Sequence, residues 1–241
     1  TLGIPEVSYT ATLTGSGGGS AGSIGLASSA IVSGMAKVVV CVGALQQAQQ
    51  RFGAITSGYE QTSETAFFQS SGLVGPGHMF ALLARRHMHM YGTTREQFAE
   101  VAMSGRLNAI NHPDAIMRKP MTLEDYFNAP VIADPLCLFD FCLETDGAIA
   151  MVVTSTEQAK DLRQPPVKIV ACAHGGSRDW GRSLYWMNMP EEAFVSSGNV
   201  AIANRLYRDA DVTPADIDVA QIYDHFTPMV LAQLEDFGFC E

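Results

Sequence analysis

Three consecutive side chains that can exchange protons, Tyr223, Asp224 and His225, stand between an apolar run and a proline-initiated helical pattern. In open α/β sheets, polar residues at the carboxyl end of a strand commonly point into a ligand-binding crevice. A tyrosine, a carboxylate and an imidazole could act there as general acids or bases. In the alternative interpretation, Tyr223 and His225 are hydrogen-bonded core residues and Asp224 caps a turn, and composition alone favours this structural role.

A second candidate is the glycine-rich stretch GSGGGSAGS, between a predicted strand and a predicted helix. Gly17, Gly19 and Gly22 match the GxGxxG pattern of dinucleotide-binding turns. Such a site also needs a carboxylate after the next strand, where this chain has LQQAQQ, so we expect no nicotinamide cofactor. The glycines could permit close helix–strand packing. They could also present N–H groups to a thioester oxygen as it becomes an enolate, and the two roles are compatible.

Other reactive side chains give weaker signals. The five cysteines are an odd number without metal-ligand spacing, and most lie in apolar runs, which indicates a reducing, cytoplasmic setting. His87 and His89 are two residues apart in a predicted helix and so face different sides. We therefore predict no metal site. We also predict no serine hydrolase, because the serines of GSGGGSAGS lack an identifiable base and orienter in the sequence.

Composition excludes several classes of function. With 241 residues, of which 47% are hydrophobic and 17% charged, the chain predicts a soluble, folded α/β protein. A net charge of −10 disfavours a nucleic-acid partner. The apolar runs are too short for a membrane span, and residues 1–9 do not resemble a secretory signal.

Strand-like and helix-like patterns alternate along the chain, which predicts a mostly parallel sheet with helices on its faces. A charge-poor helix up to Met35 should be buried, and the valine-rich run after it should be a strand covered on both faces. Thr94 and Gln97 form a capping box that opens a helix, Thr213 starts a short helical turn, and Thr227 starts a helix that ends near residue 237. The predicted strands are residues 5–13, 37–44, 146–155, 167–175 and 219–222.

Four stretches of the chain resemble the sterol-carrier-protein branch of the thiolase superfamily. Within that branch they resemble thiolase-like lipid-transfer proteins, some of which are aldolases of bacterial steroid side-chain degradation. The stretches are RRHMHMYGTTREQFAEVA (85–102), NHPDAIMRKPMTLEDYF (111–127), IADPLCLFDFCLETDGAIAMVV (132–153) and VAQIYDHFTPMVLAQLEDFGFC (219–240).

The resemblance implies the thiolase fold, with α-β-α-β-α layers and two similar halves. Residues 1–155 would form the N-terminal half, with residues 45–145 as its inserted loop domain, and residues 156–241 would begin the C-terminal half. Relative to that fold, the chain would be incomplete at both ends.

Two departures from true thiolases determine the predicted function. The acylated cysteine of thiolases would align with Gly18, within one residue, so a covalent acyl-enzyme is not expected there. Where thiolases carry Asn-Glu-Ala-Phe or His-Asp-Cys-Phe, this chain has Tyr-Asp-His-Phe, as the aldolase members do. The resemblance therefore implies a carbon–carbon lyase that cleaves a β-hydroxyacyl-CoA by a retro-aldol reaction.

In this hypothesis, Tyr223 removes the proton of the β-hydroxyl group, and His225, with Asp224 between them, orients or assists it. Gly17, Gly18 and Gly19 would accommodate the thioester. No cofactor is expected to be bound, and CoA would enter as part of the substrate. The resemblance also implies a homodimer and a small OB-fold partner protein associated with a hydratase.

Two alternatives stay open. The chain could be an acyltransferase that uses another cysteine, although the apolar neighbours of Cys41 and Cys172 disfavour a reactive thiolate. It could also be a non-catalytic carrier of lipids or acyl-CoA, to which Tyr223 and His225 would contribute only binding.

Overall fold

The computed structural model describes residues 3–13, 18–45, 63–143, 145–176 and 194–240. The chain divides into two compact units. The first unit comprises Thr1–Gln49, Thr145–Gly176 and Ala201–Thr213. The second unit comprises Gln50–Glu144, Ser177–Val200 and Pro214–Glu241. The predicted division into thiolase halves at residue 155, with an insertion over residues 45–145, stays a prediction.

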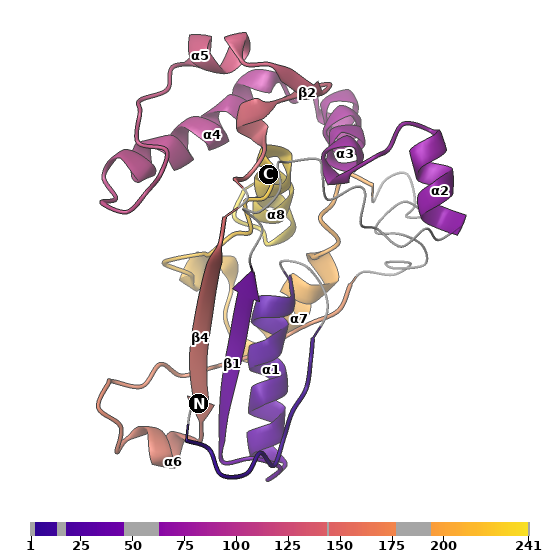
Figure 1. Cartoon of the computed structure of the whole chain (residues 1–241). Coiled ribbons are helices and arrows are strands. Elements are labelled where there is room, and N and C mark those ends of the chain that lie inside the picture. The colour runs from indigo at the N-terminus through magenta and orange to yellow at the C-terminus, as the bar shows by residue number, and fades with distance from the viewer. Residues whose placement is uncertain (1–2, 14–17, 46–62, 144, 177–193, 241) are drawn as a thin grey trace. The chain divides into compact units, whose positions relative to one another are not determined.

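The first unit is built around a two-stranded antiparallel ribbon with one helix along it (Figure 1). The ribbon pairs β1 with β4 over their full length, from Val38 opposite Thr154 to Leu45 opposite Gly147. Helix α1 packs on one face of the ribbon, where Ala27 contacts Cys41 and Val153. The elements are α1 (Gly18–Val32), β1 (Val38–Leu45), β4 (Gly147–Thr154), α6 (Thr156–Ala159) and α7 (Val200–Ala210), which begins one residue before this unit.

The ribbon corrects two predictions, because β1 and β4 are antiparallel and only one of their faces is covered in the structure. Cys41 points toward α1, whereas Val42, its neighbour on the opposite face, is 65% exposed. Val152 of β4, next to Met151, is likewise 64% exposed. Alternate residues of a strand point to opposite faces, so a wholly apolar strand exposes half of its side chains when one layer is absent. Helix α1 is likewise buried on one side only, since Val32 is exposed.

Three predicted strands are wrong, since the described residues in 5–13, 167–175 and 219–222 are not assigned to any strand. Val167, for example, is 93% exposed. A strand is completed by the hydrogen bonds of a neighbouring strand, and an apolar run in the sequence does not specify that neighbour.

The second unit is mainly helical, with one short hairpin. The predicted capping box is confirmed, because the Thr94 N–H donates to the Gln97 side chain at 2.8 Å at the start of α4. The helix predicted from Thr227 and the turn predicted near Pro214 are also confirmed. The elements are α2 (Ser63–Ser70), α3 (Pro76–Tyr91), α4 (Arg95–Ile110), α5 (Leu123–Asn128), β2 (Val131–Ala133), β3 (Leu136–Cys137), η2 (Leu138–Asp140), η4 (Pro214–Asp216) and α8 (Thr227–Asp236).

The core of the second unit joins helices that are distant in sequence. Helices α3, α4 and α8 all contribute to it, together with α5 and the hairpin. Its largest fully buried apolar and aromatic side chains include Leu83, Phe98, Tyr126 and Leu136. This core fixes the start of α8, where the candidate site lies.

Gly77 is placed for close packing, because a Cβ atom at this position would lie 2.4 Å from Cε1 of Phe141. The Phe141 ring cannot move freely, since it packs against Phe226 with ring centroids 5.0 Å apart. We expect Gly77→Ala to lower the free energy of unfolding by about 1–3 kcal/mol through overpacking, measured by urea denaturation. Gly105→Ala in α4 is the control, because its Cβ meets nothing within 4 Å and helix propensity should make it stabilising. Equal effects of the two changes would contradict the packing argument.

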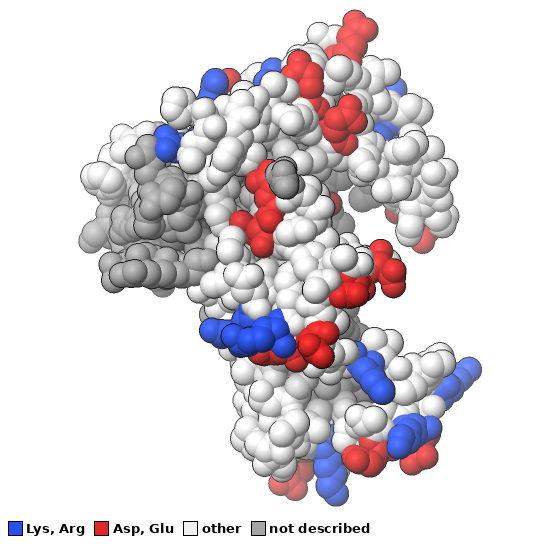
Figure 2. Space-filling view, turned by 180° about the vertical axis from the view of Figure 1, so that it is seen from behind, with Lys and Arg blue, Asp and Glu red and all other residues white. Residues whose placement is uncertain are grey.

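Surface charges are interspersed on the face drawn in Figure 2, where Lys and Arg side chains lie singly or beside acidic groups. The chain carries 25 acidic and 15 basic residues. Among the described helices, none is long and apolar enough to cross a bilayer.

Candidate active site

The three polar residues singled out in the sequence directly precede α8, in the second unit. Tyr223 is 47% exposed, Asp224 is exposed and His225 is partly buried. The N-cap of α8 is Phe226 rather than Asp224. Tyr223 therefore lies outside the core, and Asp224 is not the N-cap of α8.

The rings of Tyr223 and His225 are stacked, with centroids 4.2 Å apart and an interplanar angle of 16°. Phe80 of α3 meets the imidazole edge-on, with centroids 4.6 Å apart. Nδ1 of His225 lies 3.4 Å from the carbonyl oxygen of Tyr223. A carbonyl only accepts, so this contact is a hydrogen bond when Nδ1 carries the proton, and Nε2 then presents its lone pair.

Burial lowers the pKa of His225 to about 4, although the Tyr223 carbonyl and the charge of Asp224 favour the protonated form. Desolvation dominates because a partly buried imidazolium loses more hydration than these two groups replace. His225 is therefore neutral at pH 7, and it can receive a proton there.

The same pKa predicts how the stability of the protein depends on pH. Between pH 6.5 and pH 4 the unfolded chain binds a proton at His225 that the folded chain does not bind, so the free energy of unfolding decreases as the pH falls through this window. The effect is about 1.4 kcal/mol for each unit of pKa shift, and it is complete below the folded-state pKa. We expect His225→Gln to lose less stability than the wild type between pH 7 and pH 4, measured by urea denaturation. Identical losses would contradict the lowered pKa.

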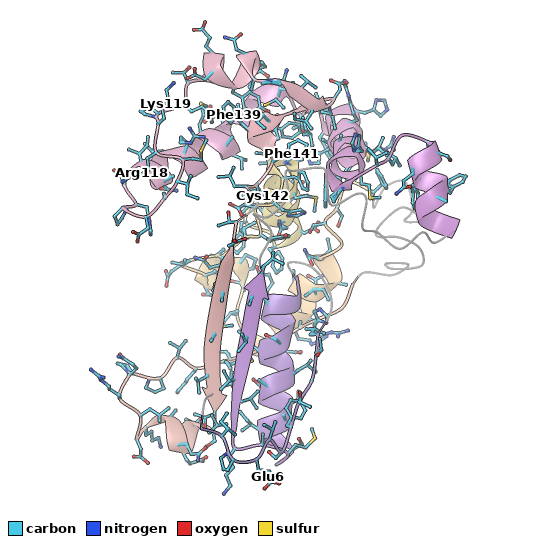
Figure 3. The ribbon with its side chains drawn as sticks, in the orientation of Figure 1. Glu6, Arg118, Lys119, Phe139, Phe141 and Cys142 are labelled. Carbon is cyan, nitrogen blue, oxygen red and sulfur yellow. The ribbon has the colours of Figure 1, made fainter. Side chains whose placement is uncertain are left out.

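Backbone contacts hold this segment in place, and sequence analysis did not identify the residues that make them. The Gln233 side chain, on α8, donates to the carbonyl oxygen of Tyr223 at 2.7 Å. The Cys142 N–H donates to the carbonyl oxygen of His225 at 3.0 Å. Figure 3 shows Cys142 and Phe141 close to α8. Gln233 could have been predicted as a neighbour of the site, because it lies on the helix that starts directly after His225. No pattern in the sequence indicated that Phe80 or Cys142 lies there.

The glycine-rich turn belongs to the first unit. Gly18 is the first residue of α1 and Gly19 the second, whereas Gly17 lies outside the described residues. At Gly22 a Cβ would lie 2.7 Å from Leu13 and 2.9 Å from His174. Helix α1 therefore packs closely at Gly22, against side chains of two segments that are not strands. The predicted role of residues 17–19 in thioester binding stays a prediction.

The two cysteines considered as alternative nucleophiles lie in unfavourable surroundings. Cys41 is buried on the face of β1 that α1 covers. Partial desolvation raises the pKa of the Cys172 thiol, although the residue is exposed by its accessible surface. A reactive cysteine needs the opposite shift, toward thiolate at neutral pH.

His87 and His89 lie in different environments, as their spacing predicted. His89 is exposed, whereas His87 is buried, with Nδ1 2.6 Å from Oγ1 of Thr93 and Nε2 3.0 Å from Oε2 of Glu235. This cluster ties α3 to the end of α8. Within the described part of the chain, no group of three His, Cys, Asp or Glu side chains could hold a metal ion.

Comparison with known proteins places these residues in context. The family model "Thiolase C-terminal domain-like" matches residues 181–241. The chain is 37% identical to the 17-hydroxy-3-oxo-4-pregnene-20-carboxyl-CoA lyase of Mycobacterium tuberculosis, over 99% of this chain and 63% of that protein. It is also 37% identical to the steroid side-chain-cleaving aldolase of Thermomonospora curvata, over 99% of this chain and 62% of that protein.

A solved structure described as an Ltp2-ChsH2(DUF35) aldolase is similar in fold and sequence. The TM-score is 0.78 and the sequence identity 36%, over 93% of this chain and 57% of that chain. The chain thus spans about three fifths of the length of the curated relatives, 63% and 62%. At this identity and TM-score, the α/β thiolase fold predicted from the sequence is confirmed.

Proposed function

The chain belongs to the thiolase superfamily, and on this basis we propose that it is a retro-aldolase that cleaves a β-hydroxyacyl-CoA of the steroid side-chain type. The observation that carries the proposal is the stacked pair of Tyr223 and His225 at the start of α8. It combines an accessible phenol with a neutral imidazole. The similarity to lyases supports the reaction class, and the 17-hydroxy steroid named for one relative is the substrate we would test first.

The proposed reaction needs a proton acceptor and an electron sink. Once His225 has taken the proton of the Tyr223 phenol, the phenolate accepts the proton of the β-hydroxyl group, and the bond between the α and β carbons breaks. The hydroxyl-bearing carbon becomes a ketone, and the electron pair passes into the thioester enolate. The enolate takes its proton from the His225 imidazolium to give a shortened acyl-CoA, and Tyr223 is left as the phenol. The reaction needs no oxidant, reductant or covalent enzyme intermediate, in keeping with a glycine where thiolases have their nucleophile.

The neighbouring groups support this role of Tyr223. His225, neutral at pH 7, can take up the proton that Tyr223 carries, and the Asp224 carboxylate favours the protonated imidazole. We retain the role that the resemblance gives to Gly17, Gly18 and Gly19, which is to accommodate the thioester, since N–H groups at a helix start can stabilise developing negative charge. The proposal requires no bound cofactor, because CoA arrives as part of the substrate.

We include two partners in the proposal. A second copy of the chain would form a homodimer, as expected from the resemblance. A small OB-fold protein would be the second partner, and the similar aldolase structure, whose name includes a DUF35 component, supports testing it.

The test is a cleavage assay with both proteins present. The chain is incubated with an OB-fold partner and a 17-hydroxy steroid that carries a short CoA-thioester side chain, and the products are followed by mass spectrometry. We expect a 17-ketosteroid and a shortened acyl-CoA. Tight binding of the CoA ester without cleavage would contradict the lyase and favour a carrier of acyl-CoA.

A further inference from the structure

Residues 140–142 of the second unit, called here the bracing segment, run alongside residues 225–227 in antiparallel order. The Thr227 hydroxyl donates to Oδ1 of Asp140 at 2.5 Å. Phe141 and Phe226 then form an isolated antiparallel β-bridge. The Cys142 N–H donates to the carbonyl oxygen of His225. Three successive residues thus contact three successive residues at the site.

The bracing segment is anchored by a buried carboxylate. Asp140 is 1% exposed and accepts hydrogen bonds from three different places. The Tyr126 hydroxyl, on α5, lies 2.8 and 2.9 Å from its two oxygens, and the Cys137 N–H lies 2.7 Å from Oδ2. The Thr227 hydroxyl is the remaining donor. A buried carboxylate is tolerated when donors replace its hydration, and three donors from different parts of the unit make this group rigid.

The Tyr126 hydroxyl of α5 stays protonated at physiological pH, so it always donates to Asp140. Burial first, and then the charge of Asp140, raise the pKa of Tyr126 above its ordinary value. The phenol therefore keeps its proton and continues to donate. As a result, the bonds from Tyr126 and Cys137 fix the bracing segment to the core without any contribution from α8. The segment can therefore hold the start of α8 in one position.

We propose that Asp140 is the positioning residue of the site, which holds the start of α8 through Thr227 and thereby sets the place of His225 and of the Tyr223 ring stacked on it. Its catalytic meaning rests on the function proposed above. The contacts described for the imidazole itself are weak, since they are ring contacts with Phe80, Tyr223 and Phe226 and a long bond of 3.4 Å to a carbonyl. The position of His225 is therefore determined by its backbone, which the bracing segment holds.

Two substitutions at Thr227 separate this role from a general loss of stability. Thr227→Val keeps the shape of the side chain but removes the hydroxyl, whereas Thr227→Ser keeps the hydroxyl and removes a methyl group. Both should lower stability, but only valine breaks the bond to Asp140. We expect Thr227→Val to lower kcat at least about tenfold, because small displacements of catalytic groups are costly, with KM changed less than about twofold. Thr227→Ser should keep the wild-type kcat.

A readout that does not depend on the substrate is the NMR signal of the His225 imidazole in protein labelled with ¹³C-histidine. His225→Gln identifies the signal. We expect Thr227→Val to shift it and to raise the pKa of His225 toward the ordinary value, since a displaced ring gains water. Thr227→Ser should leave both unchanged. Glu235→Ala, which removes the bond to His87 at the far end of α8, should lower the melting temperature without moving the signal.

The cleavage assay and the NMR titration test different claims, so each can give a negative result without the other. Absence of cleavage by the wild type would overturn the proposed function, and the NMR titration would still decide whether Thr227 positions His225. If valine and serine at position 227 give the same His225 signal, the positioning role of Asp140 is wrong. Equal kcat values for the valine and serine variants of an active enzyme would likewise show that the positioning role of Asp140 is wrong.

Discussion

We expect Tyr223→Phe to slow cleavage of the hydroxyacyl-CoA by about 10²- to 10⁴-fold, the range that a general acid–base group supplies. The substitution removes only the phenol oxygen, and the ring can still stack on His225. Tyr223 is half exposed, so the fold should lose little stability. Initial rates by mass spectrometry, together with the melting temperature of each variant, would measure both effects.

The control for this substitution is Tyr91→Phe in α3. Tyr91 is exposed as well, and its ring also meets a histidine, His87, at a centroid distance of 4.9 Å. It lies at the opposite end of α3 from the site, and its loss of a hydroxyl should leave the rate unchanged. A Tyr223→Phe enzyme as active as the Tyr91→Phe enzyme would rule out Tyr223 as the base.

The largest loss of stability is expected for Asp140→Ala. The substitution leaves the Tyr126 hydroxyl, the Thr227 hydroxyl and the Cys137 N–H without an acceptor in a buried place, and each unsatisfied donor costs about 1–3 kcal/mol. We expect the free energy of unfolding to fall by about 3 kcal/mol or more. Urea denaturation followed by far-ultraviolet circular dichroism would measure it.

Asp236 provides a matched comparison at the other end of α8. Its carboxylate accepts bonds from the hydroxyls of Ser196 and Ser197 and from the N–H of Asn199, but it is only partly buried. Water can satisfy the donors that Asp236→Ala releases, so this change should cost clearly less than Asp140→Ala. Equal losses would show that burial of the Asp140 carboxylate does not determine the effect.

The features that the sequence predicted well are those whose causes are local. The capping box at Thr94 and the proline-initiated helix at Thr227 each depend on residues within one turn. The position of Tyr223 and His225 at the start of that helix followed from the same signal. Close packing at Gly22 could also be predicted from the sequence, since it is a local steric requirement at a glycine-rich helix start.

What the sequence did not predict depends on partners that are distant along the chain. The apolar runs indicated strands, but the antiparallel pairing of β1 with β4 and the open face of their ribbon depend on which elements meet. The contact of His87 with Glu235 joins residues 148 positions apart. The aspartate in LCLFDFC looked unremarkable, because the donors that make Asp140 important are brought to it by folding.

The hydrogen bond between Asp140 and Thr227 closes a span of 87 residues, which has a kinetic consequence. Contacts between distant positions form late in folding, because the entropy of closing the intervening chain must be overcome first. Phe80, the bracing segment and the residues before α8 come together only when most of the second unit has assembled. A partly folded chain would therefore retain helices but have no site, and catalytic activity would report the completed fold of this unit more strictly than its helical content does.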